Sequence, residues 1–229
     1  MGPRGPGVSR RVRAAHQLPR GRHGLSRDHV QADQRQRILD AVADVSSLAG
    51  YQAMSIEAIC VDAGVSRRTF YDLYSGKEEA FLAAYDAVAA RLTDELRAAA
   101  RGADTFAAGV VACLRAFLEL ASAEPRNADM CIVEVLAAGP AALARRNAVM
   151  EALAALLQNG ARTVAHGSRP PQLIAQTLIG GIYEAVYARV LSGSTNELPG
   201  LLPSLSYSIL LPYLGHQQTV HELRRLHAG

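Results

Sequence analysis

Four residues in the segment 67–73 have side chains that suit contacts with nucleic acid: Arg67, Arg68, Thr69 and Tyr71. Each arginine can donate a bidentate pair of hydrogen bonds to guanine, and the threonine offers a methyl group to thymine or a hydroxyl to phosphate. Tyr71, one helical turn further along, is placed to reach a phosphate oxygen. We therefore predict that this segment is a helix whose first turn enters the major groove of DNA.

The residues before this segment predict two short helices joined by a tight turn. Ser55 and Ser66 can each cap a helix start with the side-chain oxygen, and we also expect both to contact DNA. Gly64 can adopt the positive φ that the turn needs. We expect Val65 to fill the corner between the helices and Phe70 to point into a small core. This arrangement is a helix-turn-helix.

Longer helices are expected on both sides of this motif. Residues 33–48 repeat apolar side chains at helical spacing, and Ser26 offers an earlier cap for the same helix. Residues 75–78, Ser-Gly-Lys-Glu, predict a capping box that opens a helix reaching residue 100. Lys77 stands at the start of that helix, where backbone N–H groups favour anions, so we expect it to contact a phosphate. The inner face of the long helix is predicted to hold Phe81, Tyr85, Val88, Leu92 and Leu96.

The segment around the turn resembles the N-terminal domain of TetR-family transcriptional regulators. The family pattern is close to Gly-Val-Ser-x-x-Thr-[Phe/Leu]-Tyr-x-His-Phe-x-x-Lys-Glu-x-Leu, after Ser-Ile-x-x-Ile. Two positions depart from it: Leu73 replaces the usual histidine, which removes a phosphate donor, and Tyr74 replaces the usual phenylalanine, which adds a hydroxyl that we place among the DNA contacts. The resemblance is specific over about residues 33–85. The matching residues are Ser55, Ile56, Ile59, Gly64, Val65, Ser66, Thr69, Phe70, Tyr71, Lys77 and Glu78.

The resemblance implies a ligand-responsive, sequence-specific DNA-binding regulator, a repressor that binds a palindromic operator as a dimer. Two-fold symmetry would set the two recognition helices about 34 Å apart, one turn of DNA. The partners implied are double-stranded DNA, an apolar small-molecule effector and a second copy of the chain. A tilt of the long helix on effector binding would change the spacing of the two helix-turn-helix units.

The remainder of the chain predicts a second helical region. Glycine, proline and serine mark its joints, and the expected helices cover residues 104–124, 128–138, 140–165, 171–191 and 198–214. We therefore expect an all-α fold, with an N-terminal three-helix helix-turn-helix domain and a C-terminal helical ligand-binding and dimerisation domain. The expected divisions are a basic arm (1–25), the DNA-binding domain (26–76), a connecting helix (77–100), the ligand-binding and dimerisation domain (101–216) and a tail (217–229).

Two sets of side chains in this region are candidates for function. An effector pocket between the middle helices could be lined by Arg115, Phe117, Met130, Cys131, Met150, Tyr183 and Tyr187, each of which could equally be plain core or surface. The last two helices are nearly uncharged and rich in apolar residues, and the family resemblance implies dimerisation through them as a four-helix bundle; a monomeric bundle core is the alternative. The expected interface residues are Ile174, Leu178, Gly181, Ile182, Tyr207 and Leu211.

The first thirty residues form a basic segment. They hold seven arginines and one aspartate, a net charge of +6, which leaves −3 for the remainder of a chain whose total is +3. Residues 18–24 resemble an AT-hook, so we predict that Arg20 and Arg22 insert into a narrow minor groove. The alternatives are a solvated leader, or a start upstream of the true translation start.

Other functional classes find little support in the sequence. Three cysteines show neither metal-ligand spacing nor a disulfide framework, which favours a reducing cytoplasm. The seven histidines pair with no Glu or Cys at ligand spacing, and no serine elbow or phosphate loop occurs. We therefore expect that the chain is not an enzyme and that it binds no metal and no cofactor. Prolines and glycines interrupt the apolar stretch 198–220, which argues against a membrane span. A helical interaction protein with a vestigial helix-turn-helix is the alternative function.

Overall fold

The structure, a computed structural model, describes residues 27–163 and 171–227, and all the regular structure within these ranges is helical. An all-α fold is therefore confirmed. The elements are α1 (Arg27–Ala49), α2 (Ile56–Ala63), α3 (Arg67–Leu73), α4 (Lys77–Arg101), α5 (Phe106–Ala123), α6 (Pro125–Ile132), the 3₁₀ turn η1 (Glu134–Leu136), α7 (Pro140–Gly160), η2 (Ala161–Thr163), α8 (Gln172–Leu191), η3 (Thr195–Leu201) and α9 (Leu202–His227).

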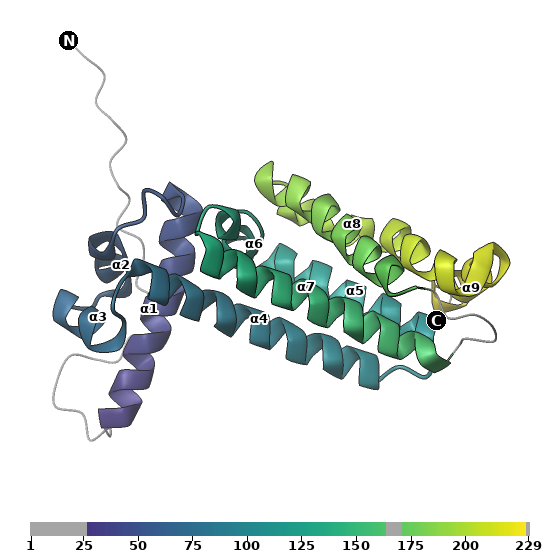
Figure 1. The fold of residues 1–229 in the computed structure, drawn as a ribbon, viewed down its shortest axis with the longest axis horizontal. Helices are drawn as coiled ribbons and strands as arrows, with labels where there is room; N and C mark the ends of the chain where they lie inside the picture. The colour runs from purple at the N-terminus through teal and green to yellow at the C-terminus, as the bar shows by residue number, and fades with distance from the viewer. Residues whose placement is uncertain (1–26, 164–170, 228–229) are drawn as a thin grey trace, which may run out of the picture.

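The molecule is elongated, with α1, α2 and α3 gathered at one end (Figure 1). We call residues 27–76 the head, and residues 77–163 and 171–227 the body. Helix α4 starts at the head and runs along the body beside α7, while α8 and α9 lie together on another side of the body (Figure 1).

Local capping explains why the helices of the head begin and end where they do. Ser55 Oγ accepts a hydrogen bond from the backbone N–H of Ala58 at 3.1 Å, and Ser66 Oγ accepts one from Thr69 at 3.0 Å. Gly64 ends α2 in the left-handed region, with φ of 63°. The predicted caps and turn are confirmed, and together they fix the angle at which α3 leaves α2.

The core of the head is apolar and closely packed. Phe70 and Phe81 are fully buried, and the ring of Tyr51 meets Phe81 edge-on at 4.9 Å between centroids. Cys60 is buried beside them, as its apolar neighbours in the sequence predict, and Val65 packs half-buried at the turn. Phe70 thus packs one face of α3 against the core of the head, and the opposite face of α3 is exposed to solvent.

The predicted capping box at the start of α4 is wrong by one residue. Gly76 is the N-cap and contributes no side-chain bond. Instead, Ser75 donates to Glu79 through both its backbone N–H, at 2.7 Å, and its hydroxyl, at 2.6 Å. These bonds lower the pKa of the Glu79 carboxyl. Because Gly76 replaces Ser75 as the N-cap, α4 begins one residue later than the pattern predicts, and Glu79 replaces Glu78 as the acceptor for Ser75.

The middle of the body also differs from the prediction. A single helix over 128–138 is replaced by α6, which begins at Pro125, and by the separate turn η1. Proline at the first helical position explains the earlier start. Of the helix predicted over 140–165, the α-helical part, α7, ends at Gly160, and the short 3₁₀ turn η2 follows it.

Helix α9 is longer than predicted and broken. It extends to His227, so residues 217–227, assigned above to a tail, are helical. Gly215 interrupts the helix with φ of 73°, and Tyr207 on one side of the break contacts His216 on the other at 2.9 Å. Leu223 and Leu226 of the second part pack against the core of the body.

Two apolar clusters organise the chain. One joins α1, α2, α3 and the start of α4 to Met130, Val135 and Ala138. These three residues belong to residues 125–138, which contain α6 and η1 and which we call the α6–η1 segment. The other lies in the body, between α5, α8 and α9. Since Ala128 and Ile132 of α6 belong to this second cluster, α6 takes part in both.

By length and composition, α5 could cross a membrane, and the bent pair of segments 125–136 and 140–160 passes the same test together. That pair bends by 118°. In the structure, α5 packs against α4, α9 and η3. We therefore interpret α5 as a core helix of the bundle.

Candidate DNA-binding surface and ligand cavity

The outer face of α3 presents a cluster of polar side chains. Arg67, Arg68 and Tyr71 are exposed, with 57% of Tyr71 open to solvent. Arg67 forms an ion pair with Glu57 of α2 at 2.8 Å, and the side chain of Arg68 makes no hydrogen bond or ion pair with the described residues. Thr69 Oγ1 lies 2.9 Å from Ser66 Oγ. The structure therefore places the predicted recognition residues together on one exposed surface, where their polar groups are open to solvent.

Lys77 occupies a different position from the one that the sequence suggests. Its ammonium donates to the backbone carbonyls of Tyr51, Gln52 and Met54 at 3.1, 3.2 and 3.0 Å. It also lies over the ring of Tyr51, 4.9 Å from the centroid. An ammonium has three hydrogens, so a phosphate contact would require one of these bonds to break. Lys77 ties the loop between α1 and α2 to the start of α4.

The placement of Tyr74 contradicts its predicted DNA contact. The side chain is only 3% exposed, and its hydroxyl is buried without a hydrogen-bond partner among the described residues. Burial raises the pKa of this phenol, against a lowering by the nearby Arg35 guanidinium, which lies over the ring. A tyrosine at this depth fills the core as phenylalanine would, so it cannot reach DNA in this conformation.

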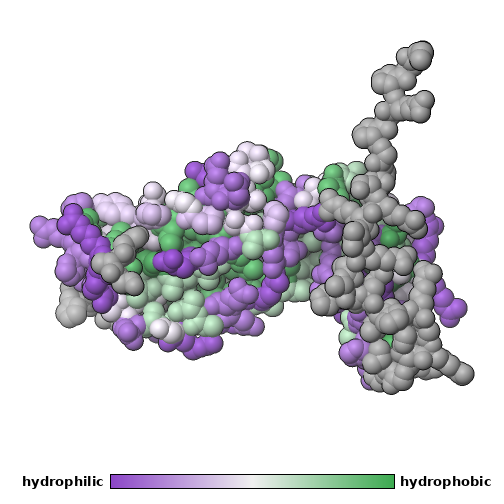
Figure 2. All heavy atoms as spheres, turned by 180° about the vertical axis from the view of Figure 1, so that it is seen from behind, coloured by the Kyte–Doolittle hydropathy of each residue, from purple (hydrophilic) through white to green (hydrophobic). Residues whose placement is uncertain are grey.

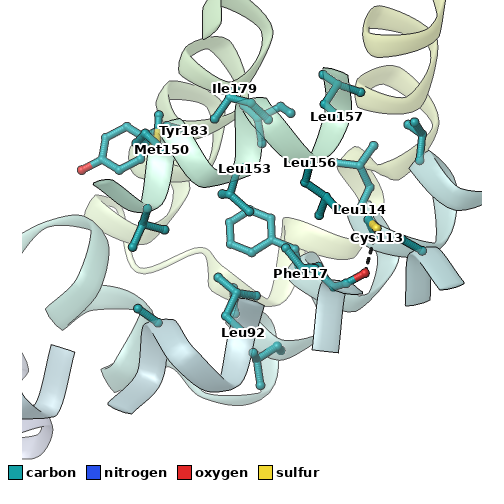
Figure 3. Close-up of a pocket in the computed structure, with 18 of the residues that line it drawn as sticks. Leu92, Cys113, Leu114, Phe117, Met150, Leu153, Leu156, Leu157, Ile179 and Tyr183 are labelled. Atoms are coloured by element: carbon teal, nitrogen blue, oxygen red, sulfur yellow. Dashed lines mark hydrogen bonds between the residues drawn. The ribbon is translucent and has the colours of Figure 1, made fainter. Parts of the chain in front are cut away.

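A cavity of about 460 Å³ lies in the body, lined mainly by α4, α5, α6, α7 and α8. Leu92, Phe117 and Leu153 line its middle, Tyr183 lies toward one end, and Cys113 lies toward the other (Figure 3). Its volume is in the range of small-molecule sites, and its wall is largely apolar.

Four of the seven predicted pocket residues line this cavity. Phe117, Cys131, Met150 and Tyr183 are in its wall, whereas Arg115, Met130 and Tyr187 are not. Arg115 is exposed on α5, Met130 is fully buried in the cluster of the head, and Tyr187 stacks on Tyr183 from outside the wall, 6.3 Å between centroids. Sequence reasoning missed Arg146, the arginine in the wall, which no motif marks.

The polar groups of the wall gather near α6. Tyr183 donates from its hydroxyl to the carbonyl of Ile132 at 2.5 Å, and the guanidinium of Arg146 lies 4.1 Å from the centroid of the Tyr183 ring. Burial raises the pKa of Tyr183, while a side-chain hydrogen bond from Arg146 and the positive charge of Arg146 lower it. Burial also raises the pKa of Cys131 to about 12, so its thiol stays protonated and weakly nucleophilic at neutral pH.

A family match covers most of the head and the start of α4. The sequence pattern of the bacterial regulatory proteins of the tetR family matches residues 38–84, from α1 into α4, and TetR-like solved structures share the arrangement of both head and body. Residues 38–84 therefore form a helix-turn-helix DNA-binding domain of the kind found in bacterial regulatory proteins of the tetR family. This extent agrees with the resemblance predicted over about residues 33–85.

Solved structures of TetR-like proteins share the fold along most of this chain. FadR, the fatty acid degradation regulator of Bacillus halodurans, is 20% identical, with a TM-score of 0.70 over 76% of this chain and 97% of that one. FadR of Bacillus subtilis, in complex with stearoyl-CoA, is 18% identical, with a TM-score of 0.68 over 80% and 99%. A TetR-like regulator from a Rhodococcus species is 25% identical, with a TM-score of 0.62 over 76% and 93%. No curated protein sequence is significantly similar.

In this TetR-family fold, the α6–η1 segment connects the head to the cavity. Arg126 forms an ion pair with Asp44 of α1, and Glu134 accepts a hydrogen bond from the backbone N–H of Tyr51. Gln52 Nε2 donates to the carbonyl of Ala137 at 2.9 Å. The other side of the segment reaches the cavity wall through Asn127, Ala128, Cys131 and Ile132.

The residues predicted for dimerisation fall into two groups. Gly181 and Leu211 are exposed, and Ile174, Leu178 and Tyr207 are half-buried on α8 and α9. Ile182 is 8% exposed and faces the cavity, so it is removed from the expected interface. Apolar surface gathers along the body in the view of Figure 2. The predicted minor-groove residues, Arg20 and Arg22, lie outside the described residues.

Proposed function

We propose that this TetR-family protein is a ligand-responsive repressor in the cytoplasm. It would bind a palindromic operator as a homodimer and release it when a small molecule occupies the cavity of the body. The observation that supports the proposal is that one chain has both an exposed polar α3 surface and an apolar cavity in the body. Proteins of this family are generally not enzymes, and the proposal needs no catalytic step.

DNA binding would use α3 as the recognition helix. Arg68, which makes no bond to the described residues, would read a base edge, and Tyr71 would contact a phosphate. Arg67 would first exchange its ion pair with Glu57 for DNA. This exchange costs little, because both side chains are well exposed, 64% and 71%, and a surface pair contributes only about 0–1 kcal/mol.

The effector signal would pass through α6 as well as α4. Ligand in the cavity touches Asn127 and Cys131, while Arg126 and Glu134 of the same segment contact α1 and the loop that follows it. A shift of α6 would therefore move the head directly. This refines the expectation that a tilt of α4 alone carries the signal.

Dimerisation would use the exposed faces of α8 and α9. Leu173 and Leu211 are 68% and 37% exposed there, and Gly180 and Gly181 leave open space in which a partner helix could approach.

An FadR structure that shares this fold binds stearoyl-CoA, which supports an effector with a long apolar part.

The test is selection of genomic DNA fragments by the full-length protein, followed by gel shifts on the selected sites. We expect a palindromic site, with Arg68→Ala and Tyr71→Phe each weakening binding by about tenfold. Arg101→Ala, an exposed arginine at the far end of α4, serves as the control and should bind normally. A folded protein that shifts no DNA even at low salt would instead support the alternative, an interaction protein with a vestigial motif.

A further inference from the structure

Three charged residues line the cavity wall, and they differ in whether an oppositely charged side chain pairs with them. They are Asp104, Glu124 and Arg146. Glu124 forms an ion pair with Arg91 and also accepts a hydrogen bond from Asn127 at 2.7 Å. Asp104 is exposed in the turn between α4 and α5, at the end of the body far from the head (Figure 1). Arg146 remains as a wall cation without a carboxylate partner among the described residues.

The surroundings of Arg146 satisfy its charge only in part. Its Nη1 donates to Asn147 Oδ1 at 3.0 Å, and the face of its guanidinium stacks on Tyr183. Its Nε is buried and has no hydrogen-bond partner among the described residues. The neighbouring Arg145, by contrast, forms an ion pair with Asp86 at 2.9 Å on the outer surface. An unsatisfied buried N–H of a charged group carries a free-energy cost, which an anion in the cavity would remove.

We propose that the effector is an amphiphile whose carboxylate head pairs with Arg146 and whose apolar tail fills the cavity toward Cys113. The inference rests on the proposed function, because it names the chemical class of that effector. A guanidinium presents a planar fork that matches a carboxylate. The wall beyond Arg146 offers the tail apolar side chains, among them Leu92, Phe117 and Leu156 (Figure 3).

The two ends of the cavity also set the direction of such a ligand. Arg146 lies near Tyr183 and the carbonyl of Ile132, at the α6 end. Glu124 also lies at the α6 end, where its ion pair with Arg91 offsets its charge. Asp104, which has no such ion pair among the described residues, would repel an anion from the opposite end. The head group would therefore lie beside α6, the segment that contacts the head of the protein. An apolar ligand without a charge would fill the same cavity but leave Nε of Arg146 unsatisfied.

The first experiment compares ligands that share one tail. Displacement of the neutral dye Nile red from the full-length protein is measured with dodecanoate, dodecanol and dodecyl phosphate. We expect dodecanoate to bind at least about tenfold more tightly than dodecanol, as one charge-assisted contact provides. Equal binding of dodecanoate and dodecanol, or no displacement by dodecanoate, would overturn the proposal. Tighter binding of dodecyl phosphate than of dodecanoate would overturn the choice of carboxylate and assign the anion to a phosphate ester.

The second experiment uses two adjacent arginines as a matched pair. Arg146→Gln should weaken dodecanoate by about tenfold to a hundredfold and leave dodecanol nearly unchanged. Arg145→Gln removes the same charge outside the cavity wall and should change neither. Arg146→Lys keeps the charge without the planar fork and should retain part of the preference. If Arg146→Gln weakens both ligands alike, Arg146 supports the cavity wall and the proposal fails.

These measurements are independent of DNA. A protein that binds dodecanoate through Arg146 yet shifts no DNA keeps the present inference and refutes the repressor function. A protein that binds its operator, but does not distinguish dodecanoate from dodecanol, keeps DNA binding and refutes the inference.

Discussion

Tyr74 buries a polar atom in the core of the head. Its hydroxyl lacks a hydrogen-bond partner among the described residues, and the side chain is 3% exposed. An unsatisfied buried hydroxyl costs about 1–3 kcal/mol of stability. We therefore expect Tyr74→Phe to raise the free energy of unfolding by about 1 kcal/mol, measured by urea denaturation. Tyr71→Phe, at an exposed position of α3, should leave stability unchanged, and a destabilised Tyr74→Phe protein would show that the hydroxyl has a partner.

Lys77 has a structural role that can be separated from DNA binding. Its ammonium bonds to three carbonyls of the α1–α2 loop. Lys77→Met should lower the free energy of unfolding by about 1.5–3 kcal/mol, since it leaves those carbonyls without their donor. Arg101→Met removes an exposed charge from the same helix and should be neutral. Unchanged stability together with weaker DNA binding would instead favour the phosphate contact predicted from the sequence.

Single residues show where sequence patterns stop being informative. Gly64 and Ser66 could be assigned because each acts within one turn of the chain, where the spacing alone fixes the partner. Tyr74 could not, since its depth depends on how α1 and α4 close over α3. Arg146 is the clearest case: the chain has many arginines, and only tertiary packing places this one in a cavity wall.

At the scale of elements, the turn of the helix-turn-helix depends on its left-handed residue. Gly64 and Gly102 both end helices, but φ is 63° at Gly64 and −78° at Gly102. Gly64→Ala should lower the free energy of unfolding by about 1–2 kcal/mol, because a Cβ strains the left-handed conformation. Gly102→Ala should be neutral or slightly stabilising, as its added Cβ would meet only ordinary contacts at 3.6 Å. Thermal denaturation of both variants compares them, and equal melting temperatures would contradict this account of the turn.

The α6–η1 segment was the element least predictable from sequence. Its residues alternate between partners in the head and in the body, so no single apolar face marks its helical extent. Pro125 signals a start, but the prediction placed the start at Ala128 and continued through Val133, where the helix stops. An element that serves two cores lacks the simple periodicity on which helix prediction depends.

The ion pair between α6 and α1 gives a test of signal transmission. Arg126→Ala removes the contact with Asp44. We expect nearly normal affinity for DNA and for dodecanoate, but a severalfold higher dodecanoate concentration for half-release of the operator, because coupling between two sites is commonly 1–3 kcal/mol. Gel shifts at increasing dodecanoate measure this, with Arg145→Ala as the surface control. Equal release by the Arg126→Ala protein would place the coupling elsewhere, for example in α4 alone.

At the scale of the whole molecule, one helix order produces two cores and a cavity. The all-α fold followed from composition and from helical spacing, and most helix bounds agree with the prediction to within a few residues. The cavity could not be predicted from the sequence, because it depends on how α4, α5, α7 and α8 diverge in space. The pattern of apolar residues on several faces is equally compatible with a filled core.

The same ambiguity between core and interface applies to α8 and α9, and a substitution on their exposed side resolves it. Leu211 is 37% exposed on α9, while Ile182 faces inward. If two copies pair through this face, Leu211→Arg places a charge in the interface without disturbing the core of one copy. We expect the variant to elute as a monomer in size-exclusion chromatography with light scattering, and to keep its melting transition at low concentration.

The operator affinity of the Leu211→Arg protein should fall by about a hundredfold or more, because each head then binds its half-site alone. Leu48→Arg, at a 74% exposed position at the end of α1, should remain dimeric, whereas a dimeric Leu211→Arg protein would assign the interface to another face.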